Sequence, residues 1–282
     1  MRVFLINSYC KINISLRVIK KLKNGLHKIN TFITFARIFD QIYLKEIKNT
    51  KDKISFYGKF KNKISKSNNT ISRILDLLRK NNFIKKIYFE IKVKKNIPTK
   101  SGLGGGSMNA ASLLTFLVKK YNLRIKQKDL FKLAAKVGSD VIVGLKFQNT
   151  FFNSGNNTIR RYKDKLNLFI LLAKPNVNCS TKLIYSKNRQ FSKQYTNKDI
   201  SKFGNFFEND VNDLENIAFK IHPKIKRLKG YLDSQKKCNF SRMTGSGSVC
   251  VAYFKDYKSA RKAELNLKKK FPNYWCKLSK AM

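Results

Sequence analysis

The sequence predicts a globular protein of the α+β class, on three observations. Hydrophobic residues make up 42% and aromatic residues 12% of the 282 positions, which is enough apolar surface to form a packed core. Segments with strand periodicity and segments with helix periodicity follow one another without steady alternation, unlike a parallel α/β fold. No internal repeat or low-complexity linker interrupts the chain, and the softest place for a domain division is near residues 150–165.

The first predicted element is a half-buried strand, because apolar and polar side chains alternate over residues 10–18. Asn24-Gly25 then signals a turn. The same patterns predict, in order, strands at 29–44 and 87–93 with edge strands and loops over 45–66, helices at 71–78, 110–118 and 130–137, apolar strands at 141–145 and 166–173, helices at 210–221 and 225–232, a turn and strand over 240–254, and a basic amphipathic helix at 257–270. Thr70 and Asp129 are the expected N-caps of two of these helices.

The most informative stretch is the glycine-rich loop at residues 98–109, between a predicted strand and a predicted helix. Its bare amides and the positive end of the following helix favour the binding of an anion such as a phosphate. Gly106 is followed by Ser107 and Met108, which excludes the Walker pattern, and Ser107 also excludes the dinucleotide fingerprint. A loop of this kind can also serve only as a sharp bend.

The net charge of +45, from 61 basic and 16 acidic residues, raises the alternative of a basic RNA-binding protein. The lysines are spread along the whole chain, however, and other residues with A/T-rich codons are abundant, so genome composition is the preferred explanation. No apolar run approaches the roughly 18 residues of a membrane span, and no leader is expected. Five cysteines without a Cys-x-x-Cys pair and two histidines make a zinc site improbable and fit a reducing cytoplasm.

Four short segments can carry chemistry, and each also has a purely structural explanation. Asp140, after Gly138-Ser139, is a possible general base or a turn cap; Lys11 is a possible active-site cation or part of a solvated strand face. His27 is a possible ligand-binding residue or an ordinary turn histidine, and residues 243–248 are a second glycine-rich loop or an ordinary tight turn.

Taken together and in order, these segments resemble the motifs of the GHMP small-molecule kinases. The matching segments are Lys11–Leu16, Gly25-Leu26-His27, Pro98 with Gly102–Ser107 and Asn109-Ala110-Ala111, Gly138-Ser139-Asp140, Asn212–Glu215 and Met243–Ser248. Within the superfamily, the triple glycine and His27 are most similar to the 4-diphosphocytidyl-2-C-methyl-D-erythritol kinases. Another GHMP kinase, acting on homoserine or mevalonate, is the alternative within the superfamily.

The resemblance implies a two-domain GHMP kinase fold and a set of site residues. An ATP-binding domain resembling ribosomal protein S5 domain 2 would span residues 1–157, and a ferredoxin-like domain residues 158–282. Asp140 would act as catalytic base, kept ionised by the ammonium of Lys11. The implied ATP-binding residues are Pro98, Ser101, Gly102, Leu103, Gly104, Gly105, Gly106, Ser107 and Met108. The implied substrate-binding residues are Asn13, Leu26, His27, Thr181 and Tyr185.

The resemblance also implies the reactants and the partners. ATP would be the co-substrate, with Mg²⁺, and the acceptor would be the 2-hydroxyl of 4-diphosphocytidyl-2-C-methyl-D-erythritol, an intermediate of non-mevalonate isoprenoid synthesis. No protein metal ligands, specific nucleic acid or membrane are expected for a cytoplasmic monomer or homodimer. Three positions depart from the family pattern: Tyr9-Cys10 replaces Pro-Ala, Leu26 replaces a stacking tyrosine, and Met108 replaces a serine.

Overall fold

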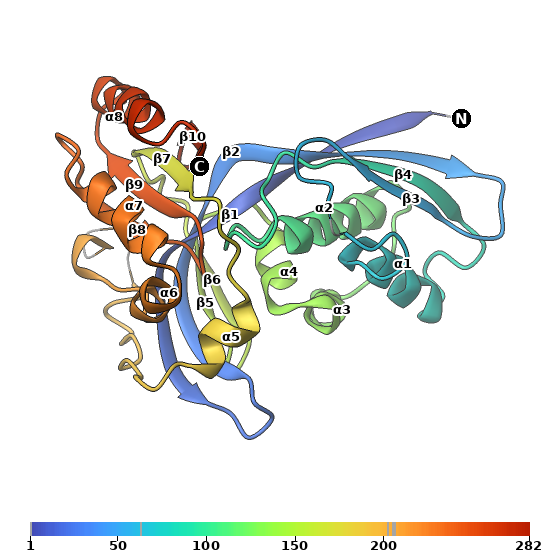
Figure 1. Cartoon of the computed structure of the whole chain (residues 1–282). Helices are drawn as coiled ribbons and strands as arrows, with labels where there is room; N and C mark the ends of the chain where they lie inside the picture. Colours follow the sequence, from blue (N-terminus) through green and yellow to red (C-terminus); the bar gives the residue numbers. More distant parts are fainter. Residues whose placement is uncertain (1, 63, 202, 205–206) are drawn as a thin grey trace. The chain divides into compact units, whose positions relative to one another are not determined.

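The computed structural model describes residues 2–62, 64–201, 203–204 and 207–282 (Figure 1). Its contacts divide the chain into two compact units, each made of several stretches of sequence. The first unit comprises Met1–Lys11, Ile38–Thr99 and Gly104–Phe147, and the second comprises Ile12–Arg37, Lys100–Leu103 and Gln148–Met282. The domain boundary at 157/158 divides the sequence at one point and stays a prediction.

Two long strands, β1 (Val3–Lys21) and β2 (His27–Ile47), pair with each other and contribute residues to both units. The turn between them is closed by the amide of Leu22 donating to the carbonyl of Leu26 at 2.7 Å. The strand predicted at 10–18 is confirmed, but the prediction that it is half-buried is wrong. Lys11 and Asn13 on its polar face are only 5% and 3% exposed, because neighbouring elements cover both faces.

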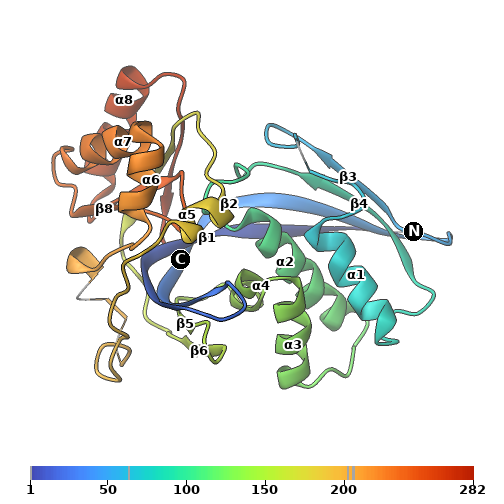
Figure 2. The ribbon, with the colours of Figure 1, turned by 60° about the horizontal axis from the view of Figure 1, so that its bottom comes forward.

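In the first unit, three strands support a layer of helices. The end of β2 pairs antiparallel with β4 (Tyr88–Lys94), and β4 pairs parallel with β3 (Lys53–Tyr57). Four helices lie together on one side of these strands (Figures 1 and 2): α1 (Thr70–Lys80), α2 (Gly105–Lys120), α3 (Gln127–Val137) and α4 (Ser139–Gly144). Leu113 and Leu117 of α2 and Ile91 of β4 are fully buried in the core of this unit.

Two predicted helix caps and one predicted strand are corrected in this unit. Asn69, not Thr70, caps α1: its side-chain oxygen accepts from the amides of Ile71 and Ser72, and Ser72 completes a capping box. Lys126, not Asp129, is the N-cap of α3.

Residues 141–145 form no strand, because most of them belong to α4. A short apolar run fits a buried strand and a buried helix equally well, so periodicity alone could not decide.

The second unit contains a four-stranded antiparallel sheet in the order β10-β7-β9-β8. Its strands are β7 (Phe169–Lys174), β8 (Phe240–Met243), β9 (Cys250–Phe254) and β10 (Trp275–Lys280). Helix α7 (Pro223–Asp233) connects β7 to β8 in the chain order, and α8 (Tyr257–Lys270) connects β9 to β10. This order of strands and helices is the ferredoxin-like arrangement that was expected.

The remaining elements of the second unit are short. They are β5 (Thr150–Asn153) and β6 (Thr158–Arg161), which extend the pairing of β2, α5 (Thr181–Ser186), the 3₁₀ turn η1 (Phe207–Asn209) and α6 (Glu215–Ile221). The helix predicted at 210–221 is therefore confirmed only from Glu215 onward. Among the described residues, no helix is both long and apolar enough to cross a membrane.

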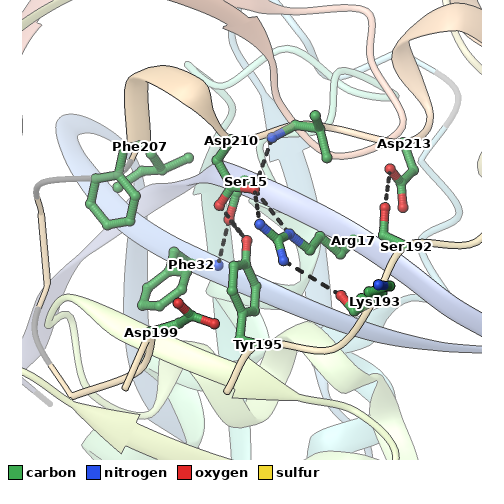
Figure 3. A network of polar contacts seen from close by, with 12 residues as sticks. Ser15, Arg17, Phe32, Ser192, Lys193, Tyr195, Asp199, Phe207, Asp210 and Asp213 are labelled. Carbon is green, nitrogen blue, oxygen red and sulfur yellow. Dashed lines mark hydrogen bonds and ion pairs between the residues drawn. The ribbon is translucent and has the colours of Figure 1, made fainter. Parts of the chain in front are cut away.

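A buried polar network connects Tyr195 and Asp210 to β1 (Figure 3). The hydroxyl of Tyr195 hydrogen-bonds the carboxylate of Asp210 and lies 2.7 Å from Oγ of Ser15. The guanidinium of Arg17 donates to the same carboxylate at 3.0 Å and covers the Tyr195 ring at 3.8 Å from its centre. Burial raises the pKa of Tyr195, so the hydroxyl remains protonated and can donate to Asp210.

Candidate active site

The glycine loop forms the start of α2 instead of only preceding it. Gly104 is the N-cap, with a left-handed φ of 67° that glycine adopts without strain, and no side chain caps the helix from this position. The helix begins five residues earlier than the sequence predicted. As a result, the positive end of α2 lies at the triple glycine, which is the arrangement that binds phosphate groups.

The three consecutive glycines meet different neighbours. A Cβ on Gly104 would lie 2.8 Å from Cγ of Lys11, and one on Gly105 would lie 3.2 Å from a methyl carbon of Ile97. A Cβ on Gly106 would meet nothing closer than 3.6 Å, at the hydroxyl of Thr70. Glycine is therefore required most strongly at 104, where both the backbone angle and the packing of Lys11 exclude a side chain.

Lys11 contacts the glycine loop and also pairs with Asp140. Its Nζ lies 3.3 Å from Oδ2 of Asp140, and the side chains are 6% and 32% exposed. The alternative that Lys11 belongs to a solvated strand face is wrong. The buried ammonium places a positive charge beside both Gly104 and a partly exposed carboxylate.

Asp140 lies in the first turn of α4, next to the loop. Gly138 ends α3 and is the N-cap of α4, and a Cβ on it would lie 3.9 Å from Oγ of Ser107. The turn that carries Asp140 thus packs close to the residue after the triple glycine. Among the described residues, Lys11 forms an ion pair with this carboxylate.

The departure at Met108 has a structural explanation. Met108 is fully buried, and its sulfur and terminal methyl would both lie 2.9 Å from a Cβ on Gly144 of α4. Its side chain therefore packs in the core, and its amide already donates to the carbonyl of Gly104 at 2.9 Å. A hydroxyl at this position would point into the same core.

In the second unit, the predicted second glycine-rich loop packs against the first half of the glycine loop. A Cβ on Gly102 would lie 2.0 Å from the carbonyl oxygen of Thr244, and the amide of Val249 donates to the carbonyl of Ser101 at 3.1 Å. This close backbone approach requires Gly102, whose φ is 82°. Pro98 and Leu103, also in the predicted ATP-binding set, are buried.

Asn13 and Thr181 are brought to this second loop. The amide of Asn13 donates to Oγ1 of Thr244 at 2.9 Å, and the side-chain amide of Asn13 donates to Thr31 at 2.8 Å. Thr181, at the start of α5, lies with its hydroxyl 2.9 Å from that of Ser246. The second unit therefore holds both residues against one turn, although they are 168 positions apart in the sequence.

His27 and Tyr185 form a separate pair in the same unit. Their ring centres are 5.2 Å apart, with the planes inclined by 41°. Burial, and secondly the charge of Lys21, lowers the pKa of His27 below its ordinary value of 6.5. Its buried Nε2 has no hydrogen-bond partner among the described residues. Leu26 beside it is 64% exposed, so neutral imidazole and one aliphatic side chain are presented together.

The sequence reasoning missed three polar residues that contact the glycine loop or its flanks. Thr70 donates to the carbonyl of Gly106 at 2.7 Å, whereas the sequence assigned it to a helix cap. Lys95 and Asp40 form a buried ion pair behind the loop. An acidic residue inside the apolar strand 29–44 was the available signal for Asp40.

Among the described residues, no group of three or more His, Cys, Asp or Glu side chains is arranged to hold a metal ion.

Comparison with known proteins supports the resemblance to the GHMP kinases. Residues 69–149 match the model of the GHMP kinases N terminal domain, and residues 192–273 match the GHMP kinases C terminal model. A 4-diphosphocytidyl-2-C-methyl-D-erythritol kinase of Pelagibacter ubique is 44% identical over the full length of both chains. The kinase of that name from Anaplasma marginale is 32% identical over 98% of this chain and 96% of its own.

Solved structures agree on the fold. A crystal structure of 4-(cytidine 5'-diphospho)-2C-methyl-D-erythritol kinase covers 98% of this chain and 99% of its own, with a TM-score of 0.77 at 22% identity. Homoserine kinase from Cytophaga hutchinsonii covers 100% and 98%, with a TM-score of 0.73 at 16% identity. These likenesses confirm the expected two-domain α+β fold.

Proposed function

The chain belongs to the GHMP kinase family, and on this premise we propose that it transfers the γ-phosphoryl group of ATP to the 2-hydroxyl of 4-diphosphocytidyl-2-C-methyl-D-erythritol. This reaction is a step of non-mevalonate isoprenoid synthesis. The choice of acceptor is supported by two relatives named as 4-diphosphocytidyl-2-C-methyl-D-erythritol kinases, which are 44% and 32% identical to this chain over 98% or more of its length. The chemistry is carried by one observation, that Lys11 contacts both the triple glycine and Asp140.

The amides of the glycine loop bind the phosphates of ATP in this proposal. The ATP-binding residues assigned in this proposal are Pro98, Ser101, Gly102, Leu103, Gly104, Gly105, Gly106, Ser107 and Met108, the last with a buried side chain that packs against Gly144. Phosphoryl transfer involves little covalent chemistry by the protein, so positioning and charge stabilisation are its main contributions. The free amides and dipole of the first turn of α2 provide both, and they support this assignment.

Asp140 accepts the proton of the acceptor hydroxyl as the phosphoryl group arrives. The partial exposure of its carboxylate leaves it accessible to a substrate hydroxyl, and the ammonium of Lys11 lies 3.3 Å from it. Lys11, in turn, offsets negative charge that develops on the transferring group. Both residues belong to the first unit, which also contains the triple glycine.

Residues of the second unit bind the acceptor. The neutral imidazole of His27, with one ring nitrogen donor and one acceptor, suits the edge of a cytosine, while Tyr185 and Leu26 offer an aromatic and an aliphatic surface to its face. Asn13 and Thr181 bind polar groups of the acceptor. Their common attachment to the turn at residues 244–246 supports this grouping.

Mg²⁺ accompanies ATP in this proposal and neutralises charge on its phosphates when bound. Magnesium is usually held by one or two protein oxygens together with substrate phosphates. The hydroxyl of Ser107, which follows the triple glycine, is an oxygen of that kind. It would hold a metal that arrives with the nucleotide, together with the phosphates.

The test is to incubate the purified protein with ATP, Mg²⁺ and the cytidylated acceptor, and to measure ADP and the 2-phosphorylated product. Homoserine and mevalonate serve as parallel acceptors. We expect turnover only with the cytidylated acceptor; turnover with another one would retain the kinase and reject the acceptor. Absence of ATP turnover together with tight, steeply salt-dependent RNA binding would favour the RNA-binding alternative.

A further inference from the structure

A buried polar cluster in the first unit lies directly behind the glycine loop. Asp40 on β2 is fully buried, and Lys95 and Asn109 are each 2% exposed. None of the three is among the residues to which the proposed function assigns contact with ATP or the acceptor. Their burial and their position around one carboxylate call for an explanation.

The carboxylate of Asp40 accepts hydrogen bonds from residues before the triple glycine and from a residue of α2 after it. On the entry side, it accepts from the ammonium of Lys95 and from the amides of Asn96 and Ile97, at 2.8 and 2.9 Å. On the exit side, it accepts from the side-chain amide of Asn109 in α2, at 3.1 Å. One side chain on a strand therefore fastens the residues just before the loop and the helix that follows it.

The fastened residues also pack against the loop itself. A Cβ on Gly105 would lie 3.2 Å from Cγ2 of Ile97 and 3.5 Å from Nζ of Lys95. A shift of the 95–97 segment would therefore displace Gly105 or be blocked by it. The position of the loop amides depends on this contact.

Stability alone does not explain a cluster of this kind. A buried ion pair loses hydration energy, and well-packed apolar residues can often replace one without loss of stability. Within the described residues, the buried side-chain oxygen of Asn109 has no hydrogen-bond partner, which further lowers the stability of the folded state. A requirement for one defined geometry would account for retaining these groups.

We propose that Asp40, Lys95 and Asn109 are positioning residues that hold the glycine loop in its phosphate-binding geometry. They act through the backbone of the loop and do not contact the substrate. The inference rests on the proposed function only in taking ATP as the ligand of the loop, and it is independent of the acceptor.

The test compares Asp40→Asn with Asp52→Asn, a matched control in the same unit. Asp52 also binds a cation and a backbone amide: it accepts from Arg79 at 2.7 and 2.8 Å and from the amide of Phe89 at 2.8 Å. Its partners lie at the end of α1 and the start of β4, outside the loop. Both variants are measured for thermal unfolding, for the Kd of ATP by competition with a fluorescent ATP analogue, and for the KM of the acceptor.

We expect both variants to lower the melting temperature, and only Asp40→Asn to weaken ATP binding, by about 10-fold or more, because small misplacements of binding groups are costly. The acceptor KM should change little in either. If Asp40→Asn does not fold, Asn109→Leu removes only the exit-side bond and should still raise the Kd of ATP by about 3-fold or more.

The inference is overturned if Asp40→Asn, or Asn109→Leu in its place, loses thermal stability while its Kd for ATP equals that of the wild type. It is also overturned if Asp52→Asn weakens ATP binding equally, or if the wild type does not bind ATP. A wild type that binds ATP but leaves the cytidylated acceptor unmodified would reject the proposed acceptor and leave this inference standing.

Discussion

The two units support their proposed binding residues in different ways. In the first unit, Lys11 contacts both Gly104 and Asp140, and the buried carboxylate of Asp40 accepts hydrogen bonds from residues before the triple glycine and after it. In the second unit, His27 is half-buried, Leu26 is 64% exposed, and Tyr185 contacts His27 through one ring pair. The two units also differ in their departures from the GHMP kinase motifs: the one at Met108 is buried, and the one at Leu26 is exposed.

At the buried position 108, methionine replaces serine and packs in the core, whereas at the exposed position 26 leucine replaces an aromatic ring that would touch the substrate. A buried site tolerates a substitution only if the new side chain fits the surrounding packing. An exposed binding surface tolerates more, at some loss of affinity. We therefore expect changes in the first unit to reduce turnover strongly and changes in the second to alter acceptor affinity modestly.

The largest expected effect is that of Asp140→Asn. Loss of the base should lower kcat by about 10²- to 10⁴-fold with little change in ATP affinity. Asp129→Asn, on the exposed side of α3 where its partner is Lys132, is the control and should retain activity. A fully active Asp140→Asn enzyme would remove this residue from the mechanism.

Lys11→Met should reduce kcat by about 10²- to 10³-fold, the usual cost of removing one group that stabilises developing charge. Methionine preserves most of the stem that packs on Gly104, so the melting temperature should change little. Lys20→Met, at an exposed position of the same strand, controls for loss of charge. Unfolding of the Lys11 variant, measured by circular dichroism, would favour a structural role.

Gly104→Ala should lower kcat/KM for ATP by about 10²-fold, because the new methyl would collide with Lys11 and the left-handed φ would be strained. Gly106→Ala is the matched comparison, since its methyl would meet nothing within 3.6 Å, and its loss should be much smaller. Equal losses in the two variants would argue against the packing of Lys11 on Gly104 as the cause.

A smaller effect is expected from protonation of His27. Because its pKa is lowered, the imidazole is neutral at pH 7 and becomes protonated only as the pH falls below 6.5. The acceptor KM should therefore stay flat from about pH 8 to 6.5 and rise at lower pH, by about 10-fold if one hydrogen bond is lost. Lys21→Gln removes the charge that helps to lower the pKa, so this rise should begin at a higher pH. If the acceptor KM does not rise at low pH in either the wild type or the Lys21→Gln variant, His27 takes no part in acceptor binding.

The smallest expected effect is a gain. Leu26→Tyr should lower the acceptor KM by about 2- to 10-fold, since aromatic pairs contribute about 0.5–1.5 kcal/mol beyond burial of area. Leu265→Tyr, at a leucine of α8 that is 53% exposed, is the control and should leave the KM unchanged. A Leu26→Tyr enzyme with unaltered KM would show that this side chain does not cover the base.

The amino-acid sequence alone determined the class of the fold, most of the elements and the candidate residues of the site. Local signals suffice for these, because strand alternation, helix spacing and glycine-rich turns depend on neighbouring residues. The amphipathic helix at 257–270 is confirmed residue for residue. Sequence order was also enough to identify the family, since several short motifs at compatible spacing are together far more specific than any one of them.

Only the tertiary structure decided which polar residues are buried and what they contact. Lys11 on a nominally polar strand face, the helical state of residues 141–144, and the attachment of Asp40 to both sides of the loop depend on residues far away in the chain. The cause is physical: desolvation, close packing and ion pairing act between groups that folding brings together, and no local pattern encodes their distances.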